Sequence, residues 1–142
     1  MKVYIWTDGA AMPNGGPAGA GYVVVGVGGL HLLGSEALGD ATNNEAEYMA
    51  VRNALRAAAD AGATSAYVRM DSAVVVGHLT GVSRARAKHL IQLKEEVEAQ
   101  KARYSPGGVR FARISRKQNG VADELAKDGA RASKAQSADR RR

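Results

Sequence analysis

The spacing of apolar residues changes after Asp40, and this change is the sequence feature that most restricts the fold. Before Asp40, short runs rich in β-branched and aromatic residues are separated by Gly and Pro. After it, segments with apolar residues three or four positions apart alternate with short apolar runs. The pattern predicts antiparallel strands joined by tight turns, followed by helices that lead the chain into parallel strands.

The boundaries of the expected elements follow from this pattern. The predicted strands are Lys2–Thr7, Ala20–Gly26, Leu30–Leu38, Ser65–Met70 and Val109–Ile114. The predicted helices run from a cap at Asn43 or Asn44 to about Ala61, and over Ser72–Leu79, Arg84–Arg103 and Gly120–Ala130. We therefore expect an α/β protein whose five-stranded mixed sheet, with three antiparallel strands and then two parallel ones, is flanked by helices. Residues 1–130 are expected to form one domain, and residues 131–142 a basic, disordered tail.

Composition excludes several classes of protein. The chain of 142 residues has no cysteine, which excludes disulfides, a thiol nucleophile and cysteine-ligated metal sites. Its first residues lack the apolar segment of a signal peptide, and no apolar run approaches the roughly 20 residues that span a membrane. We expect a cytoplasmic protein that does not enter the membrane.

Charge is divided unevenly along the chain. Acidic residues outnumber basic ones in residues 1–80, whereas basic residues outnumber acidic ones in residues 81–118. An acidic group suits a divalent cation, and a basic stretch suits a phosphate backbone. Solvated helix faces and a free tail would give the same distribution, so charge alone leaves both interpretations open.

Two aspartates directly follow predicted strands, and they come close together if those two strands lie side by side and parallel. Asp8 follows the first strand and Asp71 the fourth. Ligands of such sheets gather at the carboxyl ends of the parallel strands, so the two carboxylates are expected to lie close together. Each also has a local alternative, because Asp8 could belong to a turn with Gly9, and Asp71 could cap the following helix.

Two further acids are placed to join them. Glu47 lies on a largely apolar helix face, where a carboxylate is costly unless it is paired, binds a metal or completes a capping box. Asp123 lies in the first turn of the last helix, where the helix dipole and Lys127 would also explain it. Like charges ~4 Å apart repel by roughly 4 kcal/mol at an effective dielectric of 20, so a cluster of these acids needs cations. With oxygen ligands only, Mg²⁺ or Mn²⁺ is the natural choice.

Five motifs in this order resemble those of type 1 ribonuclease H. They are Thr7-Asp8-Gly9-Ala10, Asn14-Gly15-Gly16-Pro17, Thr42-Asn43-Asn44-Glu45-Ala46-Glu47-Tyr48, Met70-Asp71-Ser72 and Asn119-Gly120-Val121-Ala122-Asp123-Glu124-Leu125-Ala126. The resemblance covers roughly residues 1–130 and implies the ribonuclease H-like fold. It also implies an endoribonuclease that cuts the RNA strand of RNA–DNA hybrids, leaving 5′-phosphate and 3′-hydroxyl ends.

The resemblance assigns roles to particular residues. It implies that two Mg²⁺ ions, or Mn²⁺ as a substitute, are bound by Asp8, Glu47, Asp71 and Asp123. It places at the nucleic acid the residues Gly9, Ala10, Asn14, Thr42, Asn43, Asn44 and Asn119. Asparagine amides can sense the RNA 2′-hydroxyl, although turn and cap formation would explain them too. The family further implies a monomer without an obligate protein partner.

The chain departs from many family members in two places. The loop before the last helix lacks a histidine, and His31, His78 and His89 lie elsewhere, where they are expected to be structural or exposed. Arg116 matches an arginine of archaeal-type members, and it is expected to clamp a phosphate or assist product release rather than carry a proton. The segment from Gly81 to Lys88 is short and lacks the tryptophan of a basic handle, so a weaker grip on the hybrid is expected.

Three alternatives stay open at this point. The same fold could bind hybrids or structured RNA without cutting, but all four acidic positions are filled. A transposase, integrase or junction resolvase would share the acids on the first and fourth strands but not the Thr42-Asn43-Asn44 helix start. A basic α/β protein could use its acids only as caps and turns.

Overall fold

A computed structural model describes residues 1–140 of the chain. Its strands are β1 (Lys2–Ala11), β2 (Pro17–Gly26), β3 (His31–Asp40), β4 (Ser65–Met70) and β5 (Val109–Arg113). Its α-helices are α1 (Asn43–Asp60), α2 (Ala73–Leu79), α3 (Lys88–Lys101) and α4 (Gly120–Arg140). Two short 3₁₀ helices, η1 (Val27–Gly29) and η2 (Arg116–Asn119), lie in connections.

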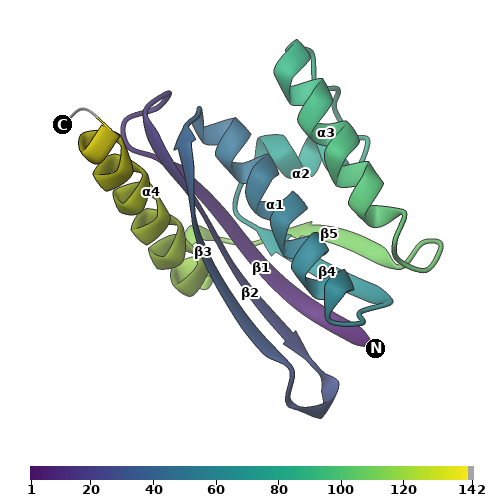
Figure 1. Cartoon of the computed structure of the whole chain (residues 1–142). Helices are drawn as coiled ribbons and strands as arrows, with labels where there is room; N and C mark the ends of the chain where they lie inside the picture. Colours follow the sequence, from purple (N-terminus) through teal and green to yellow (C-terminus); the bar gives the residue numbers. More distant parts are fainter. Residues whose placement is uncertain (141–142) are drawn as a thin grey trace.

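The five strands form one mixed sheet in the order β3-β2-β1-β4-β5 (Figure 1). β1 pairs antiparallel with β2, and β2 with β3, because short turns join them. β1 pairs parallel with β4, and β4 with β5, because helices carry the chain between them. The predicted fold class is confirmed, with the first three strands longer than predicted.

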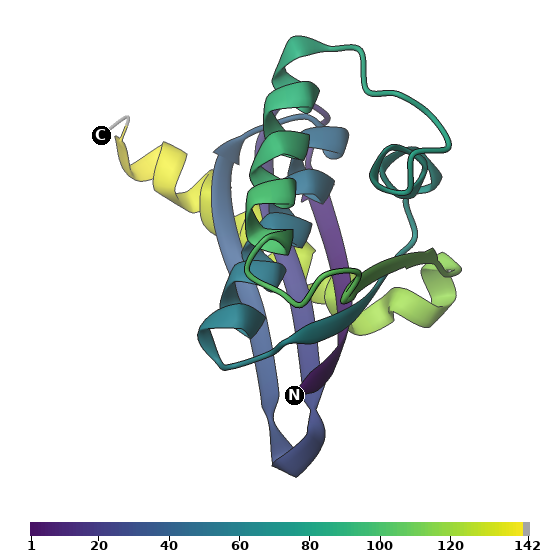
Figure 2. The same cartoon turned by 90° about the vertical axis from the view of Figure 1, so that its right-hand side faces the viewer.

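Helices cover both faces of the sheet. Figure 2 shows α1 and α3 in front of the sheet and α4 behind it. The main core lies between the sheet and α1, where Val3, Ile5, Tyr48, Leu55 and Met70 are fully buried. Side chains alternate between the two faces of a strand, so β1 presents Val3 and Ile5 to α1 and its even-numbered residues to the side of α4.

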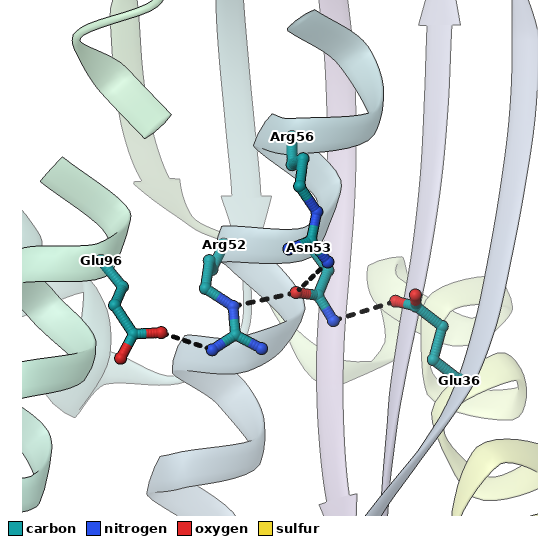
Figure 3. A network of polar contacts seen from close by, with 5 residues as sticks. All are labelled: Glu36, Arg52, Asn53, Arg56 and Glu96. Carbon is teal, nitrogen blue, oxygen red and sulfur yellow. Dashed lines mark hydrogen bonds and ion pairs between the residues drawn. The ribbon is translucent and has the colours of Figure 1, made fainter. Parts of the chain in front are cut away.

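A polar network ties α1 to its neighbours (Figure 3). The buried Asn53 side chain donates to Glu36 of β3 at 3.1 Å and accepts from Arg52 at 2.9 Å and from Arg56 at 3.1 Å. Arg52 also pairs with Glu96 of α3 at 2.6 Å. The network therefore fixes α1 between the edge strand β3 and the outer helix α3.

Two predicted helix starts are wrong. Thr42 caps α1 and Glu45 completes the capping box, so neither Asn43 nor Asn44 is the cap and Glu47 is not part of the box. The Thr42 hydroxyl reaches the backbone N–H of Glu45, which the asparagines cannot do from inside the helix. α3 begins at Lys88 rather than at Arg84, because its cap residue Ala87 is extended.

The disordered tail predicted for residues 131–142 is wrong as far as Arg140, because α4 continues to that residue. Ser133 explains the continuation. Its buried hydroxyl donates to the carbonyl of Ala18 at 2.5 Å and accepts from Leu38 N and Gly39 N at 3.0 Å each. Arg141 and Arg142 lie outside the described residues. Within residues 1–140 we find no helix with both the length and the apolar character needed to cross a membrane.

Candidate active site

Three carboxylates meet at the edge of the sheet where β1 and β4 run side by side. Asp8 lies in β1, Asp71 directly follows β4, and Glu47 projects from the first half of α1. One oxygen of each lies within 4.8 Å of the others, although the residues are far apart in sequence. The parallel pairing of Trp6 with Arg69 brings Asp8 and Asp71 together, as the sequence predicts if the first and fourth strands are parallel neighbours.

None of the three acids has the local role that would otherwise explain it. Asp8 lies inside β1, which continues to Ala11, rather than in a turn. Ser72, not Asp71, caps α2 through the N–H of Val75 at 3.2 Å. Since Glu47 is also outside the capping box of α1, the convergence of these side chains is not a by-product of helix capping or turn formation.

Two glycines let the helices approach closely enough to form this site. A Cβ atom added to Gly9 would collide with the backbone of Ala46 and Glu47 in α1. One added to Gly21, which pairs with Asp8, would collide with the backbone of α4 at Ala122. Gly9 therefore sets the distance of Glu47 from β1, and Gly21 sets the distance of the helix that carries Asp123.

Asp123 joins the same cavity from the first turn of α4. The cavity measures about 400 Å³. The predicted site residues that line it are Asp8, Gly9, Ala10, Asn43, Asn44, Glu47, Asp71, Arg116 and Asp123. Asp123 pairs with Lys127 at 3.0 Å and interacts with Asp8, but it lies outside the group of three closely spaced acids.

Burial and mutual repulsion control the protonation of the cluster. The pKa of Asp8 is raised to about 7: burial has the largest effect and raises it, the hydrogen bond with Glu47 lowers it, and the neighbouring Asp71 and Asp123 raise it. Burial and the neighbouring Asp8 also raise the pKa of Glu47 well above its usual value, against a stabilising hydrogen bond from the N–H of Gly9. Burial alone would raise the pKa of Asp123, but Lys127 and the hydrogen bond with Asp8 lower it.

The residues present fit a divalent cation. Glu47 has a buried Oε2 atom for which residues 1–140 supply no hydrogen-bond partner. Carboxylate oxygens are the ligands that Mg²⁺ and Mn²⁺ prefer, and a bound cation would replace the repulsion among the acids by attraction. An oxygen without a partner, directed into a group of carboxylates, is the arrangement that a metal ion resolves.

The predicted asparagines and Thr42 lie on one side of this cavity or next to it. Asn43 Oδ1 accepts from the N–H of Ala11 at 3.0 Å, and Asn14 Oδ1 accepts from the N–H of Asn43 at 2.8 Å. Their carbonyl oxygens are thus used within the protein, whereas their NH₂ groups can donate outward. Asn44 is exposed, and the Thr42 hydroxyl accepts from Glu45 N at 3.1 Å.

Asn119, which was predicted to contact the nucleic acid, does not line the cavity that holds the carboxylates. Its side chain is 1 % exposed and donates to the carbonyl of Thr7 at 2.8 Å. It therefore holds β1 at the residue before Asp8, which is a positioning role. Arg116, three residues earlier, is exposed and lines the cavity.

Lys127 is a site residue that sequence reasoning treated only as a structural partner of Asp123. It lines the cavity, and its ammonium group is the nearest described cation to Asp123. Its position one helical turn after Asp123 is the signal that could have placed it there. No histidine of the described chain lines this cavity: His78 bonds to Tyr48 at 2.6 Å, His31 lies beside a second cavity, and His89 is exposed.

The fold and the carboxylate cluster define an α/β domain with the ribonuclease H-like fold. The family model described as reverse transcriptase-like matches residues 6–129. The chain is 41 % identical over 130 residues to the bifunctional protein Rv2228c of Mycobacterium tuberculosis, covering 90 % of this chain and 35 % of that protein. It is also 42 % identical over 101 residues to ribonuclease HI of Halobacterium salinarum. That match covers 63 % of this chain and 51 % of that protein.

Solved structures agree with these relatives. The N-terminal RNase H domain of Rv2228c superposes with a TM-score of 0.85 at 35 % identity, covering 92 % of this chain and 99 % of that one. LC11-RNase H1 in complex with an RNA/DNA hybrid superposes with a TM-score of 0.84 at 32 % identity, covering 92 % of this chain and 98 % of that one. The chain belongs to the ribonuclease H family. It spans about a third to a half of the length of the curated relatives.

Proposed function

We propose that this protein is a metal-dependent endoribonuclease that hydrolyses the RNA strand of RNA–DNA hybrids. The observation that carries the proposal is the convergence of Asp8, Glu47 and Asp71 within 4.8 Å, beside Asp123, in a cavity edged by Asn43 and Asn44. A member of the same family has been solved with an RNA/DNA hybrid bound, which supports this class of substrate. Location in the cytoplasm and a monomeric state stay predictions.

The four acids would hold two Mg²⁺ ions, with Mn²⁺ as a substitute. When bound, such ions polarise the scissile phosphate, favour deprotonation of the attacking water and neutralise charge that develops on the leaving oxygen. Asp8 and Glu47 would supply the buried ligands, and the backbone of Gly9 favours the charged form of the Glu47 carboxylate. Asp71 and Asp123 are less buried and lie where a phosphate can reach them.

The reaction is hydrolysis of a phosphodiester. A water oxygen bonds to phosphorus, the bond from phosphorus to the 3′ oxygen breaks, and the 3′ oxygen takes a proton. The products carry 5′-phosphate and 3′-hydroxyl ends. Arg116 stays protonated, so it binds the scissile phosphate or assists release of the product rather than transferring a proton.

The asparagines would distinguish RNA from DNA. A ribose 2′-hydroxyl both donates and accepts hydrogen bonds, and the NH₂ groups of Asn14, Asn43 and Asn44 are donors suited to it. Thr42, which accepts from Glu45, can still donate its hydroxyl proton to a phosphate of the DNA strand. Recognition thus requires an RNA strand at the carboxylates and a DNA strand beside α1.

The test compares substrates. Purified protein is incubated with labelled RNA–DNA hybrid, duplex RNA, duplex DNA and single strands, each with Mg²⁺, with Mn²⁺ or with EDTA. Cleavage confined to the RNA strand of the hybrid, dependent on metal and leaving 5′-phosphates, is the expected result. Hybrid binding without cleavage would show that the protein is a binding module and not an enzyme. Cleavage of duplex DNA would contradict the proposed substrate.

A further inference from the structure

Half of one sheet face has no helix packed on it. α4 packs mainly on β2, β3 and β1, and it meets them at the end of the sheet that holds the active site. Figure 1 shows the hairpin of β2 and β3 extending well beyond α4. The alternation of side chains along the strands gives the residues of this open half. They are Lys2, Tyr4, Trp6, Val25, His31, Leu33, Ser65, Tyr67, Arg69, Arg110 and Ala112.

The open half carries a cluster of aromatic rings around one arginine, which we call the aromatic platform: Tyr4, Trp6, Tyr67 and Arg69. Tyr4 pairs with Tyr67 across β1 and β4, and Trp6 pairs with Arg69 in the next row. The Arg69 guanidinium lies 4.6 Å from the ring centre of Tyr67, 5.0 Å from Trp6 and 5.5 Å from Tyr4. All four side chains are exposed or half-buried, so their surfaces are accessible to a ligand.

The charge of the platform is not neutralised by neighbouring acids. Arg69 makes no ion pair with a carboxylate of residues 1–140. The open half includes no Asp or Glu at its strand positions, whereas the exposed Lys2 and Arg110 flank the tyrosines. The platform thus combines three aromatic rings with positive charges that no nearby carboxylate of the described residues neutralises. Such a surface is complementary to an anion that also carries flat aromatic groups.

The platform lies close to the active site along β1 and β4. Trp6 and Arg69 precede Asp8 and Asp71 by two residues, a distance of roughly 7 Å along extended chain. A second cavity of about 650 Å³ adjoins Trp6 and is lined also by Leu33, Lys117 and Val121. η2 places Arg116 at the carboxylate cavity and the next residue, Lys117, at this second cavity, so each cavity has a cation beside it.

We propose that the aromatic platform binds unpaired nucleotides of a single nucleic-acid strand, by stacking of bases on Tyr4, Trp6 and Tyr67 and by contact of phosphates with Arg69 and its flanking cations. Every base has a face that can stack, so this binding is tolerant of sequence and accepts RNA and DNA. Bases inside a duplex are already stacked on each other, so a blunt duplex offers the platform only phosphates. The platform is thereby suited to a single-stranded extension of a duplex held at the active site.

Trp6 is the only tryptophan of the chain and reports directly on this contact. The fluorescence of Trp6 is followed while the full chain, in EDTA, is titrated with oligo(dT), oligo(U), an abasic oligonucleotide or a blunt duplex of equal length. Saturable quenching by both single strands, with little by the abasic strand or the duplex, is the expected result. Absence of quenching by the single strands, or equal quenching by the abasic strand, would overturn the proposal.

Variants separate the platform from general electrostatic attraction. Tyr67→Leu keeps apolar cover on the sheet but removes a stacking ring, and loss of one such ring is expected to weaken single-strand binding about 5- to 100-fold. Arg69→Gln keeps all three rings and is expected to weaken binding as well. Arg103→Gln removes an exposed arginine that pairs with Asp60 on α1, away from the platform, and is the matched control. Equal affinity of Arg69→Gln and Arg103→Gln would contradict the proposal.

This inference does not depend on the proposed hydrolysis. Binding is measured without metal, so a protein that fails to cleave hybrids would refute the proposed function and leave the platform intact. Conversely, Tyr67→Leu is expected to cleave a blunt hybrid at the wild-type rate while losing affinity for a hybrid with a single-stranded extension. Equal affinity of wild type and Tyr67→Leu for the extended hybrid would overturn the proposal and leave the proposed function intact.

Discussion

Asp8 and Glu47 are carboxyl groups held where water cannot stabilise their charge. Both lie at the sheet edge with less than a tenth of their surface exposed, and both have raised pKa values. Such groups keep their protons to a higher pH in the folded chain than in the unfolded chain. Because a divalent cation favours the charged form, metal binding and proton release at this site are expected to be coupled.

The first prediction concerns the stability of the metal-free protein. The folded pKa of Asp8 is about 7, above its unfolded value of 3.8, so its contribution is fully present below pH 3.8 and is lost as the pH rises through about 7. Between pH 5 and pH 8 the free energy of unfolding should fall in EDTA, by an amount on the order of a few kcal/mol. Mg²⁺ should reverse the fall at pH 8.

Denaturant unfolding of wild type and Asp8→Asn in EDTA checks this expectation. Asparagine does not titrate, so the difference in stability between the two proteins should change with pH in the direction given for Asp8. The lowered pKa of the buried His78 acts in the opposite direction, but it is common to both proteins and cancels in the difference. A difference that is constant from pH 5 to pH 8 would contradict the raised pKa of Asp8.

The second prediction concerns Arg116. Its guanidinium lines the cavity and helps to lower the pKa of Asp123, so it is close enough to act on a phosphate bound there. Arg116→Ala should slow hybrid cleavage at least about tenfold, a loss of ~1.4 kcal/mol of transition-state stabilisation, without abolishing it. Single-turnover rates and hybrid affinity are to be measured beside those of Arg103→Gln. Unchanged rate and affinity in Arg116→Ala would remove Arg116 from the site.

At the scale of elements, the sequence predicted which segments are strands and helices more reliably than where they end. β4 was predicted with its observed bounds, because its buried residues alternate and turns flank it. The cap of α1 was misplaced by one or two residues, since Thr42, Asn43 and Asn44 all have side chains that can cap a helix. Choosing among them depends on where Ala11 and Asn14 lie, which is tertiary information.

The end of α4 was missed for a similar reason. The segment after Ala130 is rich in Ala, Lys and Arg and lacks an apolar stripe, so local pattern indicates a tail. The helix is held instead by one hydroxyl, Ser133, which reaches backbone groups of β2 and β3. A single polar contact of this kind, nearly a hundred residues or more from its partners in sequence, leaves no periodic signal.

The third prediction tests that contact. Ser133→Ala should lower the free energy of unfolding by about 1–3 kcal/mol, because it removes a hydrogen-bond partner from the buried carbonyl of Ala18 and from the partly buried N–H groups of Leu38 and Gly39. Ser137→Ala, one turn later in the same helix, is the matched control. Urea unfolding followed by circular dichroism measures both. Equal stability of Ser133→Ala and Ser137→Ala would show that α4 beyond Ala130 does not contribute to the fold.

At the scale of the whole molecule, the sequence predicts a mixed sheet of three antiparallel and two parallel strands, and it predicts that Asp8 meets Asp71 if the first and fourth strands are parallel neighbours, which the structure shows them to be. The distance of Glu47 from the two aspartates cannot be predicted from the sequence, because it depends on how closely α1 packs on Gly9. The burial that raises the pKa of Asp8 and the open half of the sheet are likewise products of assembly. They depend on how far α4 extends across the strands, which no local pattern encodes.

The central claim is that the acids at this edge act together through divalent cations. The initial rate of RNA cleavage in a hybrid, measured against Mg²⁺ concentration for wild type, Asp71→Asn and the exposed control Asp60→Asn, tests it most directly. Wild type and Asp60→Asn should show the same metal-dependent rate. Asp71→Asn should lose about a thousandfold or more in rate, yet unfold as cooperatively as wild type, because removing a charge lessens repulsion within the cluster. Retention of most of the activity by Asp71→Asn would contradict the account.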